Sequence, residues 1–453
     1  MPEVSASSVA VPLSSLSAWS SRPNVQAAAR NFLWLAAEKS VRLIFGMVVG
    51  FWLARHLGPS RLGTLGYCLA LTTLLGIVPT LGLEAIVRRD LLQVPRSASE
   101  LLLGSLLLRL GAGALTYLGV LVAVAGGWGL TGEERRLLAI LGVMLFQPAF
   151  SVPDFWLQVH LRAKLAVLVQ LAALVLCSGA RVWLILSNAS LAAFAWMVVI
   201  EMTLVAIGIT VVARRTGMPF VFPSVPWAAM KRLLAEAWPL MFANLAIIVY
   251  MKIDEVMLRH LVGAAAVGVY SSATRLSEVW YFLPMALAAS VLPALVRAKA
   301  GDPEAYRTRL QHYFDLSAGV AYALSIPIAL AAPWIVRVAY GAAFVEAGPI
   351  LAVHIWASIF VFLGVARSQW LVNENLQRFY LAATLAGAVA NVGLNLVFIP
   401  RWGGLGAAWA TVISYALAGW VASYFHPRVR ATAGMQTRAL FVPFRSWQYL
   451  TRR

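Results

Sequence analysis

Long apolar runs recur along the whole chain, and they constrain its fold more than any other feature of the sequence. A helix that crosses the hydrocarbon core of a bilayer needs about 20 predominantly apolar residues. Twelve windows meet this requirement: 32–54, 62–86, 101–125, 136–157, 164–187, 191–213, 234–258, 266–296, 314–336, 347–371, 377–398 and 403–426. Barrel strands are excluded, because they alternate polar and apolar residues over about 10 positions. With 61% hydrophobic and only 12% charged residues, the sequence predicts an all-α polytopic membrane protein with about twelve transmembrane helices.

Basic residues are distributed unequally between the segments that connect these windows. If the N-terminus is cytoplasmic, 22 of the 36 Lys and Arg residues fall in cytoplasmic segments, 7 on the opposite side and 7 inside the windows. Cytoplasmic loops of membrane proteins collect Lys and Arg, so we expect both termini in the cytoplasm. The net charge of +18 is then a consequence of topology, and no nucleic-acid partner is expected.

A basic, proline-containing stretch separates the first six windows from the last six. The expected organisation is a mobile cytoplasmic leader (1–30), an N-terminal six-helix lobe (31–213), a cytoplasmic connector (214–232), a C-terminal six-helix lobe (233–426) and a basic cytoplasmic tail (427–453). The leader lacks the compact apolar core of a signal peptide. The tail mixes arginines with aromatic residues, so we expect it either on the inner leaflet or in solvent.

The two halves share a repeated pattern. Arg55-His-Leu follows the first window and Arg259-His-Leu follows the seventh, an offset of 259 − 55 = 204 residues. In each half a glycine and then a proline follow at matching distances, at Gly63 and Pro79 and at Gly268 and Pro284. A repeat of six helices preserves orientation, so the lobes should be related by an axis along the membrane normal. Two such bundles around a central cavity are typical of an alternating-access transporter.

Signatures of soluble enzymes are absent from the sequence. No glycine-rich loop ends in Gly-Lys-Ser/Thr, so there is no ATP-driven motor. The six histidines lack metal-ligand spacing, and both cysteines, Cys68 and Cys177, fall in apolar stretches. We therefore expect no catalytic residue, no metal and no cofactor.

Charged residues inside the windows are costly in hydrocarbon and usually face a cavity or a partner. Spacings of three or four residues pair Glu38 with Arg42 and Arg275 with Glu278, and these could be neutralised pairs that only hold helices together. Several cations would still lack an obvious partner. Because guanidinium groups bind phosphate oxygens in a bidentate manner, we expect a cationic lumen for an anionic headgroup, formed by Lys39, Arg42, Arg109, Arg181, Arg275 and Arg367.

A second constellation could bind a coupling ion. Asp254 lies near the end of the seventh window, and Asn391 and Asn395 lie on the eleventh. Carboxylate and amide oxygens would suit Na⁺, and a carboxylate alone could carry H⁺. The alternative is an interfacial Asp and two amides that pack helices.

Several stretches resemble the Wzx-type polysaccharide or oligosaccharide flippases of the multidrug/oligosaccharidyl-lipid/polysaccharide (MOP) exporter superfamily, over roughly residues 30–425. These stretches are 51–59 (FWLARHLGP), 254–258 (DEVML), 273–278 (ATRLSE), 391–395 (NVGLN) and 403–410 (GGLGAAWA). The resemblance implies a V-shaped, MATE-like fold of two pseudo-symmetric six-helix bundles. It also implies that Arg275 matches a cavity-facing arginine of the related lipid II flippases, although Thr274 here replaces the acid that precedes it. Lys39 and Arg42 occupy the part of the first helix where those relatives carry lumenal basic residues.

The function that the resemblance implies is a flippase for cell-surface polysaccharide biosynthesis, which moves an undecaprenyl-pyrophosphate-linked oligosaccharide across the bacterial inner membrane. Its partners would be that lipid-linked oligosaccharide, the bilayer, and glycan polymerase or assembly proteins. One alternative is a cation-coupled antiporter of drugs or organic cations, which would need an acidic lumen. A membrane-embedded glycosyltransferase would need a catalytic acid or base on a large loop, and the internal loops are short.

Overall fold

Every regular element in the part of the chain that the structure describes is a helix. This computed structural model describes residues 23–93, 98–219, 226–301, 303–374 and 376–445, with the backbone alone at 23–44, 292–294, 296–297, 299–301 and 372–373. The first half consists of α2 (Pro23–Leu75), α3 (Ile77–Thr80), α4 (Leu83–Gln93), α5 (Ala98–Gly126), α6 (Gly132–Leu141), the 3-10 helix η2 (Gly142–Phe146), α7 (Gln147–Phe150), α8 (Val152–Val159), α9 (Ala163–Leu186) and α10 (Leu191–Arg215). The second half consists of α11 (Trp227–Leu261), α12 (Ala264–Glu278), η3 (Val279–Tyr281), α13 (Phe282–Gly301), α14 (Pro303–Tyr340), η4 (Ala342–Phe344), α15 (Ala347–His354), α16 (Ala357–Asn373), α17 (Gln377–Gly419), η5 (Val421–Phe425) and α18 (Arg430–Leu440).

The helices agree with the twelve expected spans. Within the described residues, nine helical segments are long and apolar enough to cross a membrane. Two of them, Phe45–Gln93 and Gln377–Phe425, each overlap two of the expected windows. The eighth window is divided by η3 between α12, which has 15 residues, and α13.

Glycines allow the turns inside the two longest helices. Gly58 has φ 73° and is followed by Pro59, and Gly403 has φ 55° three residues after Pro400. Glycine occupies this left-handed region without the steric cost that other residues meet. The fourth span is also broken, because η2 and the short helix α7 interrupt it between α6 and α8. These breaks free backbone carbonyl groups, and buried side chains use them as described below.

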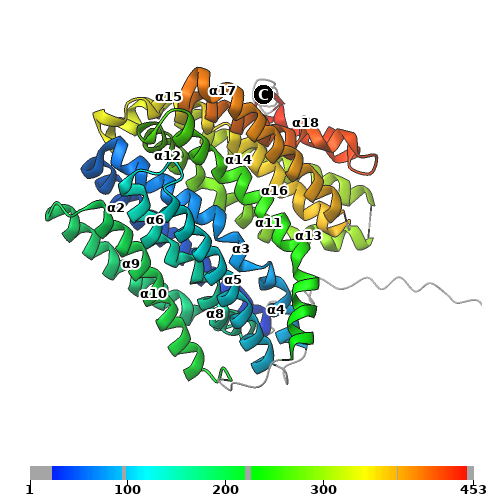
Figure 1. The fold of residues 1–453 in the computed structure, drawn as a ribbon. Coiled ribbons are helices and arrows are strands. Elements are labelled where there is room, and N and C mark those ends of the chain that lie inside the picture. The colour runs from blue at the N-terminus through cyan, green and yellow to red at the C-terminus, as the bar shows by residue number, and fades with distance from the viewer. Residues whose placement is uncertain (1–22, 94–97, 220–225, 302, 375, 446–453) are drawn as a thin grey trace, which may run out of the picture.

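The two lobes lie side by side and meet along α2 and α12 (Figure 1). One end of the molecule carries the end of α4, the start of α5 and the segments 160–162 and 216–219, and we call it the connector end. The opposite end, which we call the hairpin end, carries the turns at 58, 127–131, 187–190, 262–263, 341 and 403. The largest buried apolar cluster joins the lobes, since it contains Leu57 and Leu138 from the first half and Val267 and Ile350 from the second.

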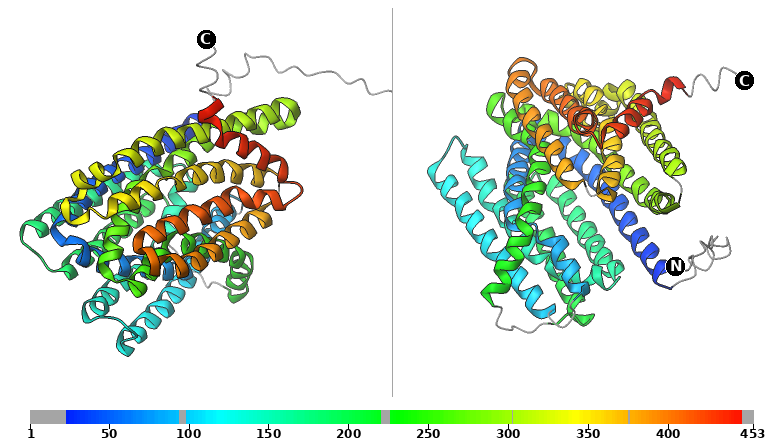
Figure 2. Two further views of the ribbon diagram at one scale, coloured as in Figure 1. Left: turned by 90° about the horizontal axis from the view of Figure 1, so that it is seen from above. Right: turned by 90° about the vertical axis from the view of Figure 1, so that its right-hand side faces the viewer.

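Three expected boundaries differ from the structure. Helix α2 begins at Pro23, inside the expected leader, and α11 begins at Trp227, inside the expected connector. Residues 1–22 of the leader lie outside the described part. In the tail, residues 430–440 form α18, which packs on the C-terminal lobe in both views of Figure 2. The Gln436 amide there donates to the Gly419 carbonyl at 2.9 Å, so this part of the tail is a helix that packs against the C-terminal lobe.

Candidate functional site

A cavity of about 330 Å³ lies between the two lobes, close to where α2 and α12 meet. Its lining includes Gly46 and Gly50 of α2, Arg275 and Glu278 of α12, and Tyr340 of α14. The Arg275 side chain is exposed to this cavity. It forms no ion pair with any carboxylate whose side chain the structure describes. Arg275 is therefore a candidate for binding an anion in this cavity.

The charges beside Arg275 pair differently from the expectation. The alternative that Arg275 and Glu278 form a neutralised pair is not what the described side chains show, because Glu278 instead lies 3.8 Å from the Lys252 ammonium group. Lys252 also donates to Glu255 at 3.0 Å. The cavity-lining pair Arg275 and Glu278 and their neighbours Lys252 and Glu255 carry two positive and two negative charges, so the described charges at and next to the cavity balance.

Asp254 is the centre of a buried polar network beside this cavity. Its carboxylate, 3% exposed, accepts hydrogen bonds from Tyr270 at 2.7 Å, from Thr411 at 2.6 Å and from the Asn395 amide at 2.6 Å. Asn395 also donates to the Asn391 carbonyl oxygen at 3.1 Å. The structure thus brings together the three residues that the sequence singled out, from α11 and α17.

Two members of this network were missed in the sequence. Tyr270 lies on α12 and Thr411 on the second part of α17, and hydroxyl residues in apolar windows gave no signal that distinguished them from ordinary packing residues. The side-chain carbonyl oxygen of Asn395 is buried without a hydrogen-bond partner among the described residues. An oxygen of this kind next to a carboxylate suits a small cation.

Arg109 and Arg367 do not line the cavity between the lobes. Both side chains are 2% exposed and donate to backbone or hydroxyl oxygens next to helix breaks. Arg109 donates to the Pro148 carbonyl at 2.8 Å, beside the break in the fourth span. Arg367 donates to the Ala418 carbonyl at 2.7 Å and to Ser423 at 2.8 Å, where α17 gives way to η5. Their role in this structure is to satisfy acceptors that the helices leave open.

Arg181 also differs from the expectation. Its guanidinium group lies 2.7 Å from the Glu201 carboxylate, and both side chains are largely buried. The expectation that Arg181 lacks a partner is therefore wrong, and its charge is neutralised within the N-terminal lobe. The side chains of Glu38, Lys39 and Arg42 lie outside the described residues, although the backbone there is helical.

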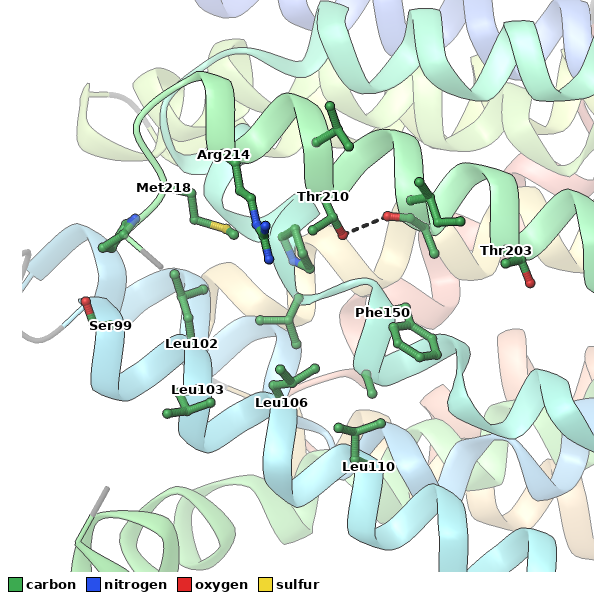
Figure 3. A pocket seen from close by; sticks show the side chains of 17 residues that line it. Ser99, Leu102, Leu103, Leu106, Leu110, Phe150, Thr203, Thr210, Arg214 and Met218 are labelled. Carbon is green, nitrogen blue, oxygen red and sulfur yellow. Dashed lines mark hydrogen bonds between the residues drawn. The ribbon is translucent and has the colours of Figure 1, made fainter. Parts of the chain in front are cut away.

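A larger cavity, of about 510 Å³, lies elsewhere, within the N-terminal lobe. It lies between α5, the α7–α8 region and α10, and Figure 3 shows leucines of α5 facing Thr210 and Arg214 of α10 across it. The Thr210 hydroxyl donates to its own helix at 2.7 Å. Because the walls are mainly apolar and Arg275 and Asp254 are not among them, we separate this cavity from the candidate site. Among the described residues, no three His, Cys, Asp or Glu side chains come together in a way that could hold a metal ion.

Comparison with known proteins adds family and fold. The profile of the family described as "Polysaccharide biosynthesis protein" matches residues 28–299, and that of the MatE family matches residues 239–397. No curated protein matches the chain. Three solved structures share its fold. An inward-facing multidrug resistance MATE family transporter of the MOP superfamily has a TM-score of 0.67 at 18% identity, covering 89% of this chain and 98% of that one.

The second is the lipid II flippase MurJ in an inward closed conformation, with a TM-score of 0.67 at 15% identity and 93% coverage of both chains. The third is an outward-facing MATE family transporter, with a lower TM-score of 0.59 at 19% identity, covering 90% of this chain and 96% of that one. At these identities the likeness shows a fold, which is that of the MOP-superfamily transporters.

Proposed function

Because this chain belongs to the polysaccharide biosynthesis protein family, whose profile spans residues 28–299, we propose that it is a flippase for an oligosaccharide linked to a polyprenyl pyrophosphate. The cargo would be undecaprenyl-linked and would cross a bacterial inner membrane during synthesis of a cell-surface polysaccharide. The MOP transporter fold supports movement of a substrate between the lobes. The sugars would cross in the hydrated cavity while the polyprenyl chain stays in lipid.

The observation that carries this proposal is Arg275, a cation exposed to the cavity between the lobes and without a described carboxylate partner. Guanidinium binds the oxygens of a pyrophosphate in a bidentate manner, and such charge-assisted bonds are about twice as strong as neutral ones. Lys39 and Arg42 belong to the proposal through their spacing. They precede the cavity-lining Gly46 by seven and four residues, which on a helix corresponds to the same face.

The Asp254 network supports a proposal for coupling. A cation such as Na⁺, or a proton, would bind at Asp254 with Asn391, Asn395 and Thr411, and it would draw together α11 and both parts of α17. A ligand can shift a conformational equilibrium only if it binds the two states with different affinity. Asp254 lies on the same helix as Lys252, and the Lys252 ammonium group lies 3.8 Å from the cavity-lining Glu278, so occupation of this site would affect the cavity.

The decisive experiment is export of the lipid-linked oligosaccharide by a strain that depends on this chain. We expect Arg275→Ala and Arg42→Ala to lower export by about 10- to 100-fold, which is the effect of losing charge-assisted hydrogen bonds of about 1.5–3 kcal/mol. Lipid-linked precursor should accumulate on the cytoplasmic face, while insertion into the membrane is unchanged. Arg136→Ala, a loss of charge at an exposed site, is the matched control. Export that survives both cavity substitutions would contradict the proposal.

A cation-coupled antiporter of drugs or organic cations is the second candidate. The MatE profile match and the two carboxylates beside the cavity, Glu255 and Glu278, favour it. Such an antiporter would lower the accumulation of a cationic dye in cells, and Glu278→Gln would abolish this effect while Arg275→Ala would preserve it. If the chain is a flippase, Arg275→Ala should lower export of the oligosaccharide while Glu278→Gln preserves it, and the protein should have no effect on dye accumulation.

A further inference from the structure

The repeated Arg-His-Leu tripeptide lies at the hairpin end of both lobes, and each of its arginines reaches into the opposite lobe. Arg55 of α2 donates from Nε to the Ala339 carbonyl at 3.1 Å and also contacts the Val338 carbonyl, at the end of α14. Arg259 of α11 donates from both sides of its guanidinium group to Glu134 at the start of α6, with 3.0 Å for the second bond. Arg55 of the N-terminal lobe therefore binds the C-terminal lobe, and Arg259 of the C-terminal lobe binds the N-terminal lobe.

The chemistry of both contacts favours strong binding between the lobes at the hairpin end. Arg55 meets free carbonyl groups at a helix C-terminus, where the helix dipole attracts a cation. Glu134 is 1% exposed and is already held by its own helix, because Thr131 donates to it from the backbone at 2.8 Å and from the hydroxyl at 3.0 Å. A carboxylate that is fixed in this way loses little freedom when Arg259 binds.

The repeated glycines lie directly inside this ring of contacts. A Cβ atom on Gly63 would lie 1.7 Å from the Ala264 carbonyl oxygen, and one on Gly268 would lie 2.0 Å from the Pro59 carbonyl oxygen. The backbones of α2 and α12 therefore touch at this point, and no other residue type fits at either position. Next to them, the Tyr67 hydroxyl lies 3.3 Å from the His260 ring across the lobes.

We propose that Arg55 and Arg259–Glu134 form a two-part latch, closed over the glycine contact, which holds the lobes together at the hairpin end in this conformation. Both parts link residues of different lobes, so they must break when the lobes separate at this end. The latch stabilises one conformation only, and this differential stabilisation sets the balance between the two states. It concerns the conformational equilibrium and does not depend on the identity of the cargo.

The test measures access to the cavity from each side of the membrane, without any transport. A single cysteine replaces Val279, which lines the cavity, in a chain that carries Cys68→Ala and Cys177→Ala. A membrane-impermeant maleimide is then applied to right-side-out and to inside-out vesicles. We expect Arg259→Gln, Glu134→Gln and Arg55→Gln each to raise the labelling rate from the hairpin side by about tenfold, within the range expected for loss of a charged hydrogen bond.

Matched controls separate the latch from general damage. Glutamine at 134 can still form the capping box with Thr131, so Glu134→Gln removes the charge and keeps the helix start. Glu133→Gln and Arg61→Gln change the same charges at exposed neighbouring positions and should label like the parent. The double variant of positions 134 and 259 should match either single variant, because both belong to one contact, and Arg259→Lys should restore part of the closure.

Gly63→Ala and Gly268→Ala provide an independent arm, because their added methyl groups would meet backbone atoms only in the closed state. We expect labelling from the hairpin side to rise and labelling from the connector side to fall. Gly119→Ala, at a helical position with open space around it, is the control. If the latch and glycine variants label like their controls from both sides while remaining folded by thermal melting, the latch does not exist, whatever the cargo.

Discussion

At the scale of single residues, Asp254 carries the most specific prediction about coupling. It is a fully buried carboxylate that accepts three hydrogen bonds, next to an Asn395 oxygen that has no partner in the described structure. A cation bound here stabilises the folded state by about 2.7 kcal/mol at a concentration of 100 times its Kd. We therefore expect the thermal midpoint of the purified protein to rise in Na⁺ relative to choline, and Asp254→Asn to abolish the rise.

The control for this prediction is Asp315→Asn, which removes a carboxylate that Arg445 contacts at 3.4 Å on a different helix. A proton as the coupling ion would give a different pattern, with no effect of Na⁺ and with a pH dependence of the midpoint that Asp254→Asn removes. If neither Na⁺ nor pH distinguishes the variant from the parent, the network only packs helices.

The same scale shows where sequence reasoning succeeds and where it stops. Asn391 and Asn395 could be grouped with Asp254 because all three are polar side chains in apolar windows whose oxygens suit a cation, and the structure brings them together. The partner of Arg181 could not be found, since Glu201 lies on another helix and its facing direction depends on how α9 and α10 pack. Arg109 and Arg367 looked like free cations because the sequence gives no sign of the backbone carbonyls that they bind.

At the scale of elements, hydropathy located the spans but not their breaks. The segments η2 (GVMLF) and η3 (VWY) are themselves apolar, so the windows read as continuous although the backbone changes its course there. Helix α18 was also not predicted from the sequence. Its buried face consists of small and polar residues, among them Thr432, Ala433 and Gln436, which give no amphipathic pattern of large apolar residues.

The packing of α18 yields a prediction at this scale. Gln436 donates to the Gly419 carbonyl at 2.9 Å and accepts from Ser423 at 3.2 Å, and Ser423 in turn accepts from Arg367. Gln436→Leu leaves these buried groups without partners, at a cost of about 1–3 kcal/mol for each unsatisfied group. We expect a lower thermal midpoint and faster proteolysis of the C-terminal tail. Gln377→Leu, at an exposed glutamine, should change neither, and equal behaviour of the two variants would show that α18 is not held by this network.

At the scale of the whole molecule, the duplication explains more than the number of helices. The tripeptide and glycine matches were visible in the sequence as a weak repeat, and the structure places all four positions at one contact between the lobes. Sequence comparison of the halves could not show that each arginine binds the opposite lobe, because the partners, Glu134 and the end of α14, are not part of the repeat. These partners of the two arginines could be identified only from the structure.

The sidedness of the molecule is the last prediction, and it decides what closure at the hairpin end means. The seven basic residues expected outside, including Arg55, Arg136 and Arg401, border the turns of the hairpin end, whereas the 22 expected in the cytoplasm include Arg162 and Arg215 at the connector end. Cytoplasmic loops retain Lys and Arg, so we expect the hairpin end to face away from the cytoplasm.

A reporter that fluoresces only in the cytoplasm should be active when fused after residue 445, and alkaline phosphatase should be active when inserted at Gly129. The closed latch would then seal the outer side and leave the cavity accessible from the leaflet where lipid-linked precursors are made. The reverse reporter pattern would place the latch on the cytoplasmic side and would contradict loading of the cargo in this conformation.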